Sequence, residues 1–247
     1  MATQDVISFT NNMTSELSMQ QHPYYPLDSV IPNYVPNTWP VLALLAAFFG
    51  VCTVLFSSTY YLAKSLNPRI SRNELVTIMW FVLSGSIHLL FESYYTLHFT
   101  TLGSLQTLPA QLWKEYAFSD SRYLTANTMV LSLETMTAVC WGPGCLIVAW
   151  LIMRNHSMRY PAQMVVSVGQ AYGDAIYYAT SLFDEFVGGV KYSRPEGVYY
   201  WGYFVLMNAF WIVVPGFLVY QAATEMARAV RVARSMEERS RSPEKAM

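Results

Sequence analysis

Three ionisable side chains, His88, Glu92 and Glu134, lie in otherwise apolar stretches of this 247-residue chain. His88 and Glu92 are four residues apart, so in a helix they share a face. A low dielectric raises the pKa of a carboxyl group and prepares it to donate a proton, while a neighbouring ionised carboxylate stabilises positive charge. These residue types predict either proton transfer or the binding of a cation inside a hydrophobic ligand.

The stretches that carry these groups have the composition of membrane helices. Hydrophobic residues make up 53% of the chain and charged residues only 13%, about half the usual charged share. Continuous runs such as VLALLAAFF favour helices over the alternating strands of a barrel. We predict an all-α integral membrane protein, a bundle of five transmembrane helices at about 39–63, 75–99, 124–153, 161–183 and 198–222, flanked by segments 1–38 and 223–247.

Basic residues in the connections predict the orientation. Eleven lysines and arginines follow the first, third and fifth predicted spans, and four lie on the opposite side. Because cytoplasmic flanks carry the excess of basic residues, the C-terminus is predicted to be cytoplasmic and the N-terminus lumenal or external. Segment 1–38 lacks the pattern of a signal peptide but holds a glycosylation sequon at Asn12. The arginine-rich segment from Gln221 onward is expected to continue as a basic helix on the cytoplasmic leaflet.

Further polar residues follow the same pattern of one stripe per helix. They are Thr137 beside Glu134, Gln170 and Asp174 in the fourth span, and Asn208 and Trp211 in the fifth. Counted from the lumenal end, all lie roughly 10 to 20 Å deep at 1.5 Å per residue, the level of His88 and Glu92. We therefore predict that four helices face one another around a shared cavity.

Several of these residues also have purely structural interpretations. A lone amide in a membrane helix usually joins two helices, so Gln170 and Asn208 are each expected to make interhelical hydrogen bonds. Asp174 lies beside Gly169 and Gly173, which permit close helix approach, and is expected to hydrogen-bond to a neighbouring helix. The connection 100–123, rich in aromatic and charged residues, is either an interfacial belt or a rim over a pocket.

Composition excludes other classes of protein and site. A net charge of −1 gives no basic field for nucleic acid. The three cysteines (Cys52, Cys140 and Cys145) lie in apolar runs without disulfide or zinc spacing. The chain has no phosphate-binding loop and no dinucleotide motif, and two histidines in spans are too few for a di-iron cluster. The remaining enzymatic interpretation is a proton rearrangement that needs no metal and no cofactor.

At these residues the sequence resembles the emopamil-binding protein family, the sterol Δ8,Δ7-isomerases of the endoplasmic reticulum. The resemblance runs in order over about residues 75 to 216, through the blocks GSIHLLFE (Gly85–Glu92), QLWKEYA (Gln111–Ala117), DSRY (Asp120–Tyr123), ETMTA (Glu134–Ala138), WGP (Trp141–Pro143), SVGQAYGD (Ser167–Asp174), MNAFW (Met207–Trp211) and Pro215–Gly216.

The resemblance implies a five-helix bundle whose membrane-accessible cavity takes a Δ8 sterol and cationic amphiphilic drugs. The implied reaction moves a ring double bond from C8=C9 to C7=C8 through a carbocation. His88 and Glu92 would donate the proton, and Glu134 would accept one or balance the cation. Five residues would line the substrate site: Thr137 and Asn208, which would also orient the carboxylates, Trp211, which would stabilise the cation through its ring, and Tyr116 and Arg122.

Two alternatives use the same buried groups. One is a membrane protein that binds sterols or cationic amphiphiles without catalysis. The other is a proton-coupled transporter, which would need a path to both faces, whereas the predicted ionisable groups lie in the lumenal halves of the spans. A homodimer is also expected, because few polar loops cover the lipid-facing helices.

Overall fold

The computed structural model describes residues 21–241, so the sequon at Asn12 lies outside the described residues. Within that range the chain is helical and has no β-strand, as the apolar runs predict. The α-helices are α2 (Val41–Leu66), α3 (Arg72–Ser86), α4 (Ser93–His98), α5 (Leu108–Tyr116), α6 (Thr128–Met136), α7 (Gly142–Met153), α8 (Arg159–Gly188) and α9 (Asn208–Arg241).

Three wide π-helical segments interrupt the long helices. They are η1 (Ile87–Glu92), between α3 and α4; η4 (Thr137–Trp141), between α6 and α7; and η5 (Val198–Met207), directly before α9. Single π turns of this kind often occur at functional sites. The connections also contain two short 3₁₀ turns, η2 (Leu102–Ser104) and η3 (Ser121–Tyr123).

Four helices of the described chain are long and apolar enough to cross a membrane. They are Val41–Leu66, Arg72–His98, Thr128–Met153 and Val198–Arg241, and they correspond to the first, second, third and fifth predicted spans. Helix α8 has 30 residues, about 45 Å at 1.5 Å per residue. It is more polar, because Arg159, Asp174, Asp184 and Glu185 lie along it. The fourth span therefore stays a prediction.

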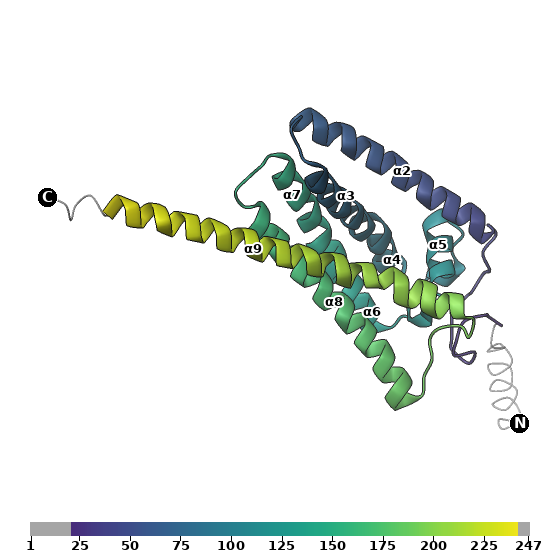
Figure 1. Ribbon diagram of the computed structural model, residues 1–247. Helices are drawn as coiled ribbons and strands as arrows, with labels where there is room; N and C mark the ends of the chain where they lie inside the picture. The colour runs from purple at the N-terminus through teal and green to yellow at the C-terminus, as the bar shows by residue number, and fades with distance from the viewer. Residues whose placement is uncertain (1–20, 242–247) are drawn as a thin grey trace, which may run out of the picture.

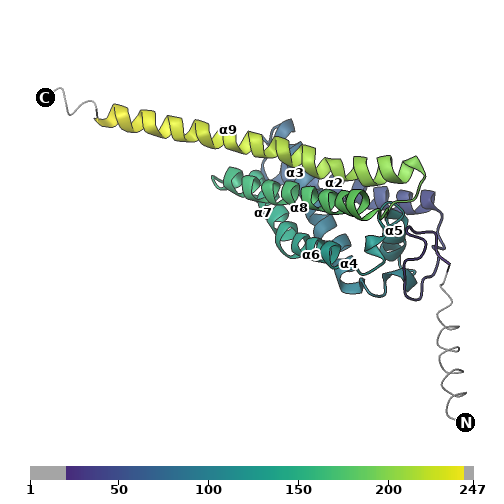
Figure 2. The same ribbon diagram turned by 90° about the horizontal axis from the view of Figure 1, so that it is seen from below.

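The helices pack as a bundle with one long arm (Figure 1). Helices α8 and α9 lie side by side, α3 packs against α7, and α2 lies at the outside against α3 and α5. Figure 2 shows α8 and α9 adjacent from a second direction, with α6 and α7 on the other side of α8. Helix α9 runs straight past the bundle to Arg241, so the helical continuation expected beyond Gln221 is confirmed.

Local signals set where several helices begin and end. Ser71 caps α3 by accepting a hydrogen bond from the backbone N–H of Glu74. The Glu74 carboxylate in turn accepts one from the backbone N–H of Ser71, which makes a capping box. Asn127 caps α6 by accepting hydrogen bonds from the backbone N–H groups of Met129 and Val130. Helix α8 ends at Gly188 and is capped by Gly189, whose φ of 68° is readily adopted by glycine. Glu74 also pairs with Arg159 at 2.6 Å, which joins the first turns of α3 and α8.

The aromatic connection between the second and third long helices forms a packed core. Trp113 stacks on Phe91 with ring centroids 4.3 Å apart and on Tyr123 at 4.6 Å. Both Trp113 and Tyr123 are buried, so an interfacial belt is the wrong interpretation for these two residues. Tyr95 and Tyr116 complete the cluster. The connection therefore holds the ends of α4, α5 and α6 in fixed positions.

Residues 21–40 cross this end of the bundle as an extended strap. Gln111 on α5 accepts hydrogen bonds from the backbone N–H groups of Thr38 and Trp39, at 2.8 and 2.9 Å. Lys114 donates to the backbone oxygen of Val35 at 2.7 Å, and the Tyr24 hydroxyl donates to the backbone oxygen of Lys114. The strap thus covers Lys114, which is fully buried.

We expect the pH dependence of stability to reveal this buried lysine. Burial lowers the pKa of Lys114 to about 8, whereas an unfolded lysine titrates near about 10.4. Between these values the unfolded chain binds more protons, so stability rises with pH, and below pH 8 the contribution is constant. Relative to Lys114→Met, the wild-type protein should gain on the order of 2 kcal/mol between pH 7 and 9.5.

Thermal unfolding of both proteins in detergent across this pH range measures the gain. If the two stability curves run parallel from pH 7 to 9.5, the lysine does not titrate in the folded protein and the prediction is wrong.

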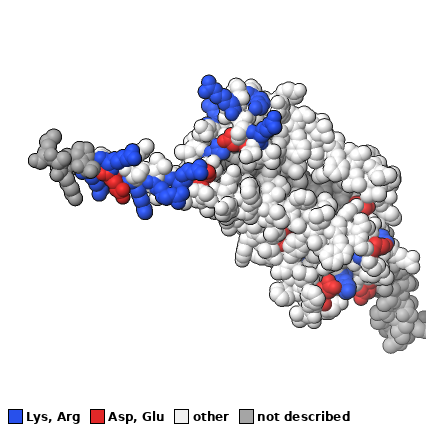
Figure 3. Space-filling model, in the orientation of Figure 1, with Lys and Arg blue, Asp and Glu red and all other residues white. Residues whose placement is uncertain are grey.

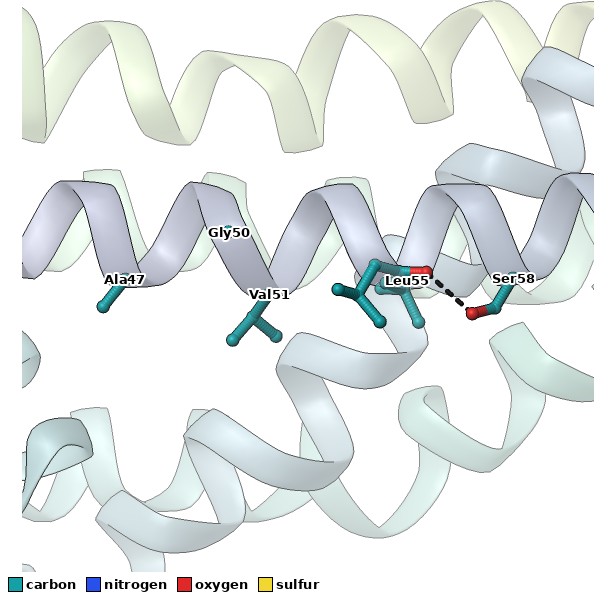
Figure 4. Close-up of a pocket in the computed structure, with 6 residues that line it drawn as sticks. Ala47, Gly50, Val51, Leu55 and Ser58 are labelled. Atoms are coloured by element: carbon teal, nitrogen blue, oxygen red, sulfur yellow. Dashed lines mark hydrogen bonds between the residues drawn. The ribbon is translucent and has the colours of Figure 1, made fainter.

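A groove of about 570 Å³ runs along the middle of α2 (Figure 4). Its lining comes from α2 alone: Ala47, Gly50, Val51, Val54, Leu55 and Ser58. The Ser58 hydroxyl is bonded to the Val54 backbone oxygen of the same helix. Because its lining is otherwise apolar and it contains none of the buried acids, this groove is not a candidate for proton chemistry.

Candidate functional site

The first two site residues lie on the π turn η1. His88 Nδ1 is 2.7 Å from Glu92 Oε2, and both side chains are buried, with 2% and 8% of each residue exposed. Gly142 allows the close packing of this turn, because a Cβ there would lie 2.7 Å from Leu89 Cγ and 3.3 Å from His88 Cβ. The structure thus forms the imidazole–carboxyl pair that the four-residue spacing predicts.

A second helix brings Thr137 and Glu134 to this pair. Segments η1 and η4 pack against each other, and the Thr137 hydroxyl hydrogen-bonds to Glu92 Oε2. The same hydroxyl lies 2.8 Å from the backbone oxygen of Glu134. The carboxyl groups of Glu92 and Glu134 also interact. Two acids, an imidazole and a hydroxyl are therefore contiguous.

Glu134 is held on its other side by an aromatic hydroxyl. Tyr123 donates to Glu134 Oε1 at 2.6 Å, and both residues are buried. This contact joins the carboxyl group to the aromatic core of the connection. It also gives the ionised form of Glu134 a strong donor, since hydrogen bonds to carboxylates are short and charge-assisted.

The predicted residues of the fifth span lie in a neighbouring group. Asn208, the first residue of α9 after η5, and Tyr116 on α5 are hydrogen-bonded through both amide atoms of Asn208, at 2.9 and 3.1 Å. Asn208 thus makes the interhelical bond expected of it. The Trp211 ring lies 5.4 Å from that of Trp80, and its N–H has no partner among the described residues. Tyr116 reaches the acid cluster through its ring contact with Tyr123, at 5.4 Å.

Arg122 is fully engaged by protein groups. Its guanidinium pairs with Asp120 at 2.6 Å and donates to the Thr180 hydroxyl and the Tyr177 backbone oxygen. Only 1% of Arg122 is exposed. This ion pair braces the turn that presents Tyr123, so Arg122 bears on the site through its neighbour.

Such a cluster can both give and take a proton in a dry environment. An acid and an acceptor, each held by hydrogen bonds, are what general acid–base catalysis requires. Among residues 21–241, no group of three or more His, Cys, Asp or Glu side chains could hold a metal ion.

Residues 108–222 match the family described as EXPERA (EXPanded EBP superfamily). The chain is 36% identical over 209 residues to the 3-beta-hydroxysteroid-Delta(8),Delta(7)-isomerase of Rattus norvegicus, covering 84% of this chain and 90% of that protein. The Mus musculus protein of the same name is 36% identical, with coverage of 85% and 91%, and that of Cavia porcellus is 33% identical, with coverage of 83% and 88%.

The chain belongs to the emopamil-binding protein (EXPERA) family. The resemblance inferred from the sequence blocks is thereby confirmed. The EXPERA match includes Glu134 and Asn208 and begins after His88 and Glu92. The geometry joins these two parts, because Thr137 inside the matched range contacts Glu92 outside it.

Two residues that contact the cluster of His88, Glu92, Thr137 and Glu134 were not among the predicted site residues. Tyr123 belongs to the aromatic connection, where sequence gives no indication that it turns back onto Glu134. Gln170 was placed at the depth of the acids and expected to link two helices, but was not named as a site residue. Its Nε2 is 3.1 Å from His88 Nε2, so the interhelical bond is made to the imidazole itself.

The expectation for Asp174 was wrong in detail. Its Oδ2 is buried and has no hydrogen-bond partner in the described chain, so no bond to a neighbouring helix is made by that atom. Of the two glycines beside it, only Gly169 is closely packed: a Cβ there would lie 2.3 Å from Trp141 Cζ2, whereas Gly173 faces open space. The close approach is made by an aromatic ring rather than by a helix backbone.

Proposed function

We propose that this protein is a sterol Δ8,Δ7-isomerase that needs no cofactor. The observation that supports this most directly is the contact of Glu92 with both His88 and Thr137, which places an acid next to Glu134. The printed names of the Rattus norvegicus, Mus musculus and Cavia porcellus relatives agree with that chemistry.

In the proposed reaction the proton count is balanced. The His88–Glu92 pair donates one proton to C9, positive charge develops at C8, and one proton leaves C7 to Glu134. The ring of Trp211 stabilises the cation, an interaction worth about 2 kcal/mol when desolvated. Thr137 orients the Glu92 carboxyl group, and Tyr116 and Asn208 form the adjoining wall of the cavity. Arg122 holds Tyr123 in place through Asp120.

The membrane setting is part of the same proposal. We place the protein in the endoplasmic reticulum membrane, with α8 as the fourth of five spans, a sterol cavity open to the lipid, the N-terminus lumenal and the C-terminus cytoplasmic. Figure 3 supports this orientation, because lysines and arginines gather at the end bearing the α2–α3 connection and along the α9 arm. Cationic amphiphilic drugs would compete with the sterol, and two copies would pair.

Turnover of a Δ8 sterol by purified protein tests the proposal. We expect conversion to the Δ7 sterol without added metal or nucleotide. Chromatography and mass spectrometry measure this conversion. In deuterium oxide the product should carry one deuterium at C9, because the donated proton comes from an exchangeable group. Sterol binding without conversion would instead favour a non-catalytic binder. Sterol uptake into proteoliposomes driven by a pH gradient would favour a transporter.

A further inference from the structure

Gln170 is a buried glutamine that faces the catalytic imidazole from a third helix. Only 3% of the residue is exposed, and its Nε2 lies 3.1 Å from His88 Nε2 and 3.4 Å from Cys145 Sγ. The other ring nitrogen of His88 is 2.7 Å from Glu92 Oε2. The imidazole is therefore held between a carboxyl group on its own helix and an amide on α8.

This arrangement specifies the tautomer of the neutral imidazole. A neutral histidine carries one N–H and one lone pair. With Nδ1 donating its proton to the Glu92 carboxylate, the lone pair on Nε2 accepts the N–H of Gln170. The hydrogen bond made by one ring nitrogen of a histidine commonly sets whether the other nitrogen carries a proton.

The same amide can also serve the protonated imidazole. When both ring nitrogens carry protons, Nε2–H needs an acceptor. Gln170 Oε1 is buried and has no hydrogen-bond partner among the described residues, so turning the amide by half a revolution supplies that acceptor. A carboxylate would favour only the protonated ring, and an ammonium only the neutral one. An amide satisfies both states at similar cost.

The titratable groups around this set come from two long helices, Arg72–His98 and Thr128–Met153. Glu92 lies on the helix of His88, Glu134 on α6 interacts with Glu92, and Cys145 on α7 contacts Gln170. Because the surrounding ionisable groups are carboxyls and a thiol, a protonated His88 has counter-charges on one side and depends on Gln170 on the other.

We propose that Gln170 is a positioning residue that holds the His88 ring in both of its protonation states by turning its amide. The proposal rests on the proposed isomerase function, in which the donor pair loses a proton to C9 and regains one after C7 is deprotonated. The His88–Glu92 pair must therefore change protonation state twice per turnover. Gln170 keeps the ring aligned through both changes.

Three variants test this assignment in the full-length protein. Gln170→Leu removes the donor and the acceptor, and should lower kcat about 10-fold to 100-fold with little change in KM, in line with leaving a buried polar group unpaired. Gln170→Glu offers Nε2–H a permanent acceptor that cannot also serve the neutral ring, and should lower kcat and change the pH profile of kcat. Gln163→Leu is the matched control, because Gln163 is equally buried on α8 and bonds to the Leu218 backbone oxygen and Gln221.

The control should lower thermal stability and leave the pH profile of kcat unchanged. A Gln170→Leu enzyme with wild-type kcat and pH profile would overturn the proposal, as would a Gln163→Leu enzyme with the same altered profile. Nitrogen-15 NMR of labelled histidine gives a second readout that needs no turnover. We expect the neutral form of His88, the state after proton donation, to be the Nδ1–H tautomer, and its Nε2 signal to shift in Gln170→Leu; an unshifted signal contradicts the contact. If the wild-type protein leaves the Δ8 sterol unconverted, the proposed function fails, and the NMR result alone decides the role of Gln170 at His88.

Discussion

Replacing Glu92 by glutamine should reduce sterol turnover about 10²-fold to 10⁴-fold, the usual contribution of a general acid or base. Glutamine has nearly the same shape and keeps an oxygen for the bonds from His88 and Thr137. Glutamine carries no negative charge to stabilise the protonated imidazole, so the donor pair is lost while the packing of η1 is kept. We therefore expect kcat to fall and the thermal midpoint in detergent to stay within a few degrees of wild type.

Glu115→Gln provides a matched control for this measurement. Glu115 is a partly buried acid on α5 whose Oε1 lies 3.5 Å from the Tyr203 hydroxyl. It lies outside the acid cluster, so the same change of charge should leave kcat nearly unchanged. Near wild-type turnover of a Δ8 sterol by Glu92→Gln would remove Glu92 from the catalytic assignment.

Asp120→Ala should be the most destabilising of the substitutions considered, with a loss of about 3–5 kcal/mol. The substitution leaves the Arg122 guanidinium buried without its counter-charge, and Asp120 itself is fully buried. It also removes the acceptor for the backbone N–H of Arg122. Thermal unfolding in detergent should show a midpoint lower by roughly 10 °C.

Glu196→Ala is the control for the ion pair. Arg194 and Glu196 form a pair with the same two-residue spacing, but the Glu196 side chain is 46% exposed. Exposed pairs of this kind are screened by solvent and contribute little to stability, so the midpoint should move by only a few degrees. Equal losses in the two variants would show that burial of the Asp120–Arg122 pair has no special weight.

Sequence was sufficient to find the acids and the helices that carry them. A charge within a long apolar window is conspicuous because lipid cannot solvate it, which is why Glu92 and Glu134 could be singled out. The four most apolar helices were predicted for the same reason. Helix α8 extends beyond its predicted ends because Arg159 and Glu185 lie in helical turns outside the apolar window.

The partners of those acids could not be predicted from the sequence. Depth along a helix follows from counting residues, but the direction in which a side chain points depends on how the helix is turned. Asn208 lies at the predicted level yet bonds to Tyr116 rather than to an acid. The contact of Tyr123 with Glu134 depends on a connection that folds back, which the buried Asp120–Arg122 pair holds in place.

The three π turns give the helices a change of angular phase. Each residue of an α-helix advances by about 100°, so one residue accommodated in a wider turn rotates everything after it relative to everything before. The direction of the α6 face that carries Glu134 and the direction of the α7 face beyond Trp141 are therefore set independently. Both segments nevertheless belong to one continuous helix. Deleting a single residue from η4 would keep this helix continuous but rotate α7 about its axis. Gly142 and Cys145 would then turn away from the imidazole.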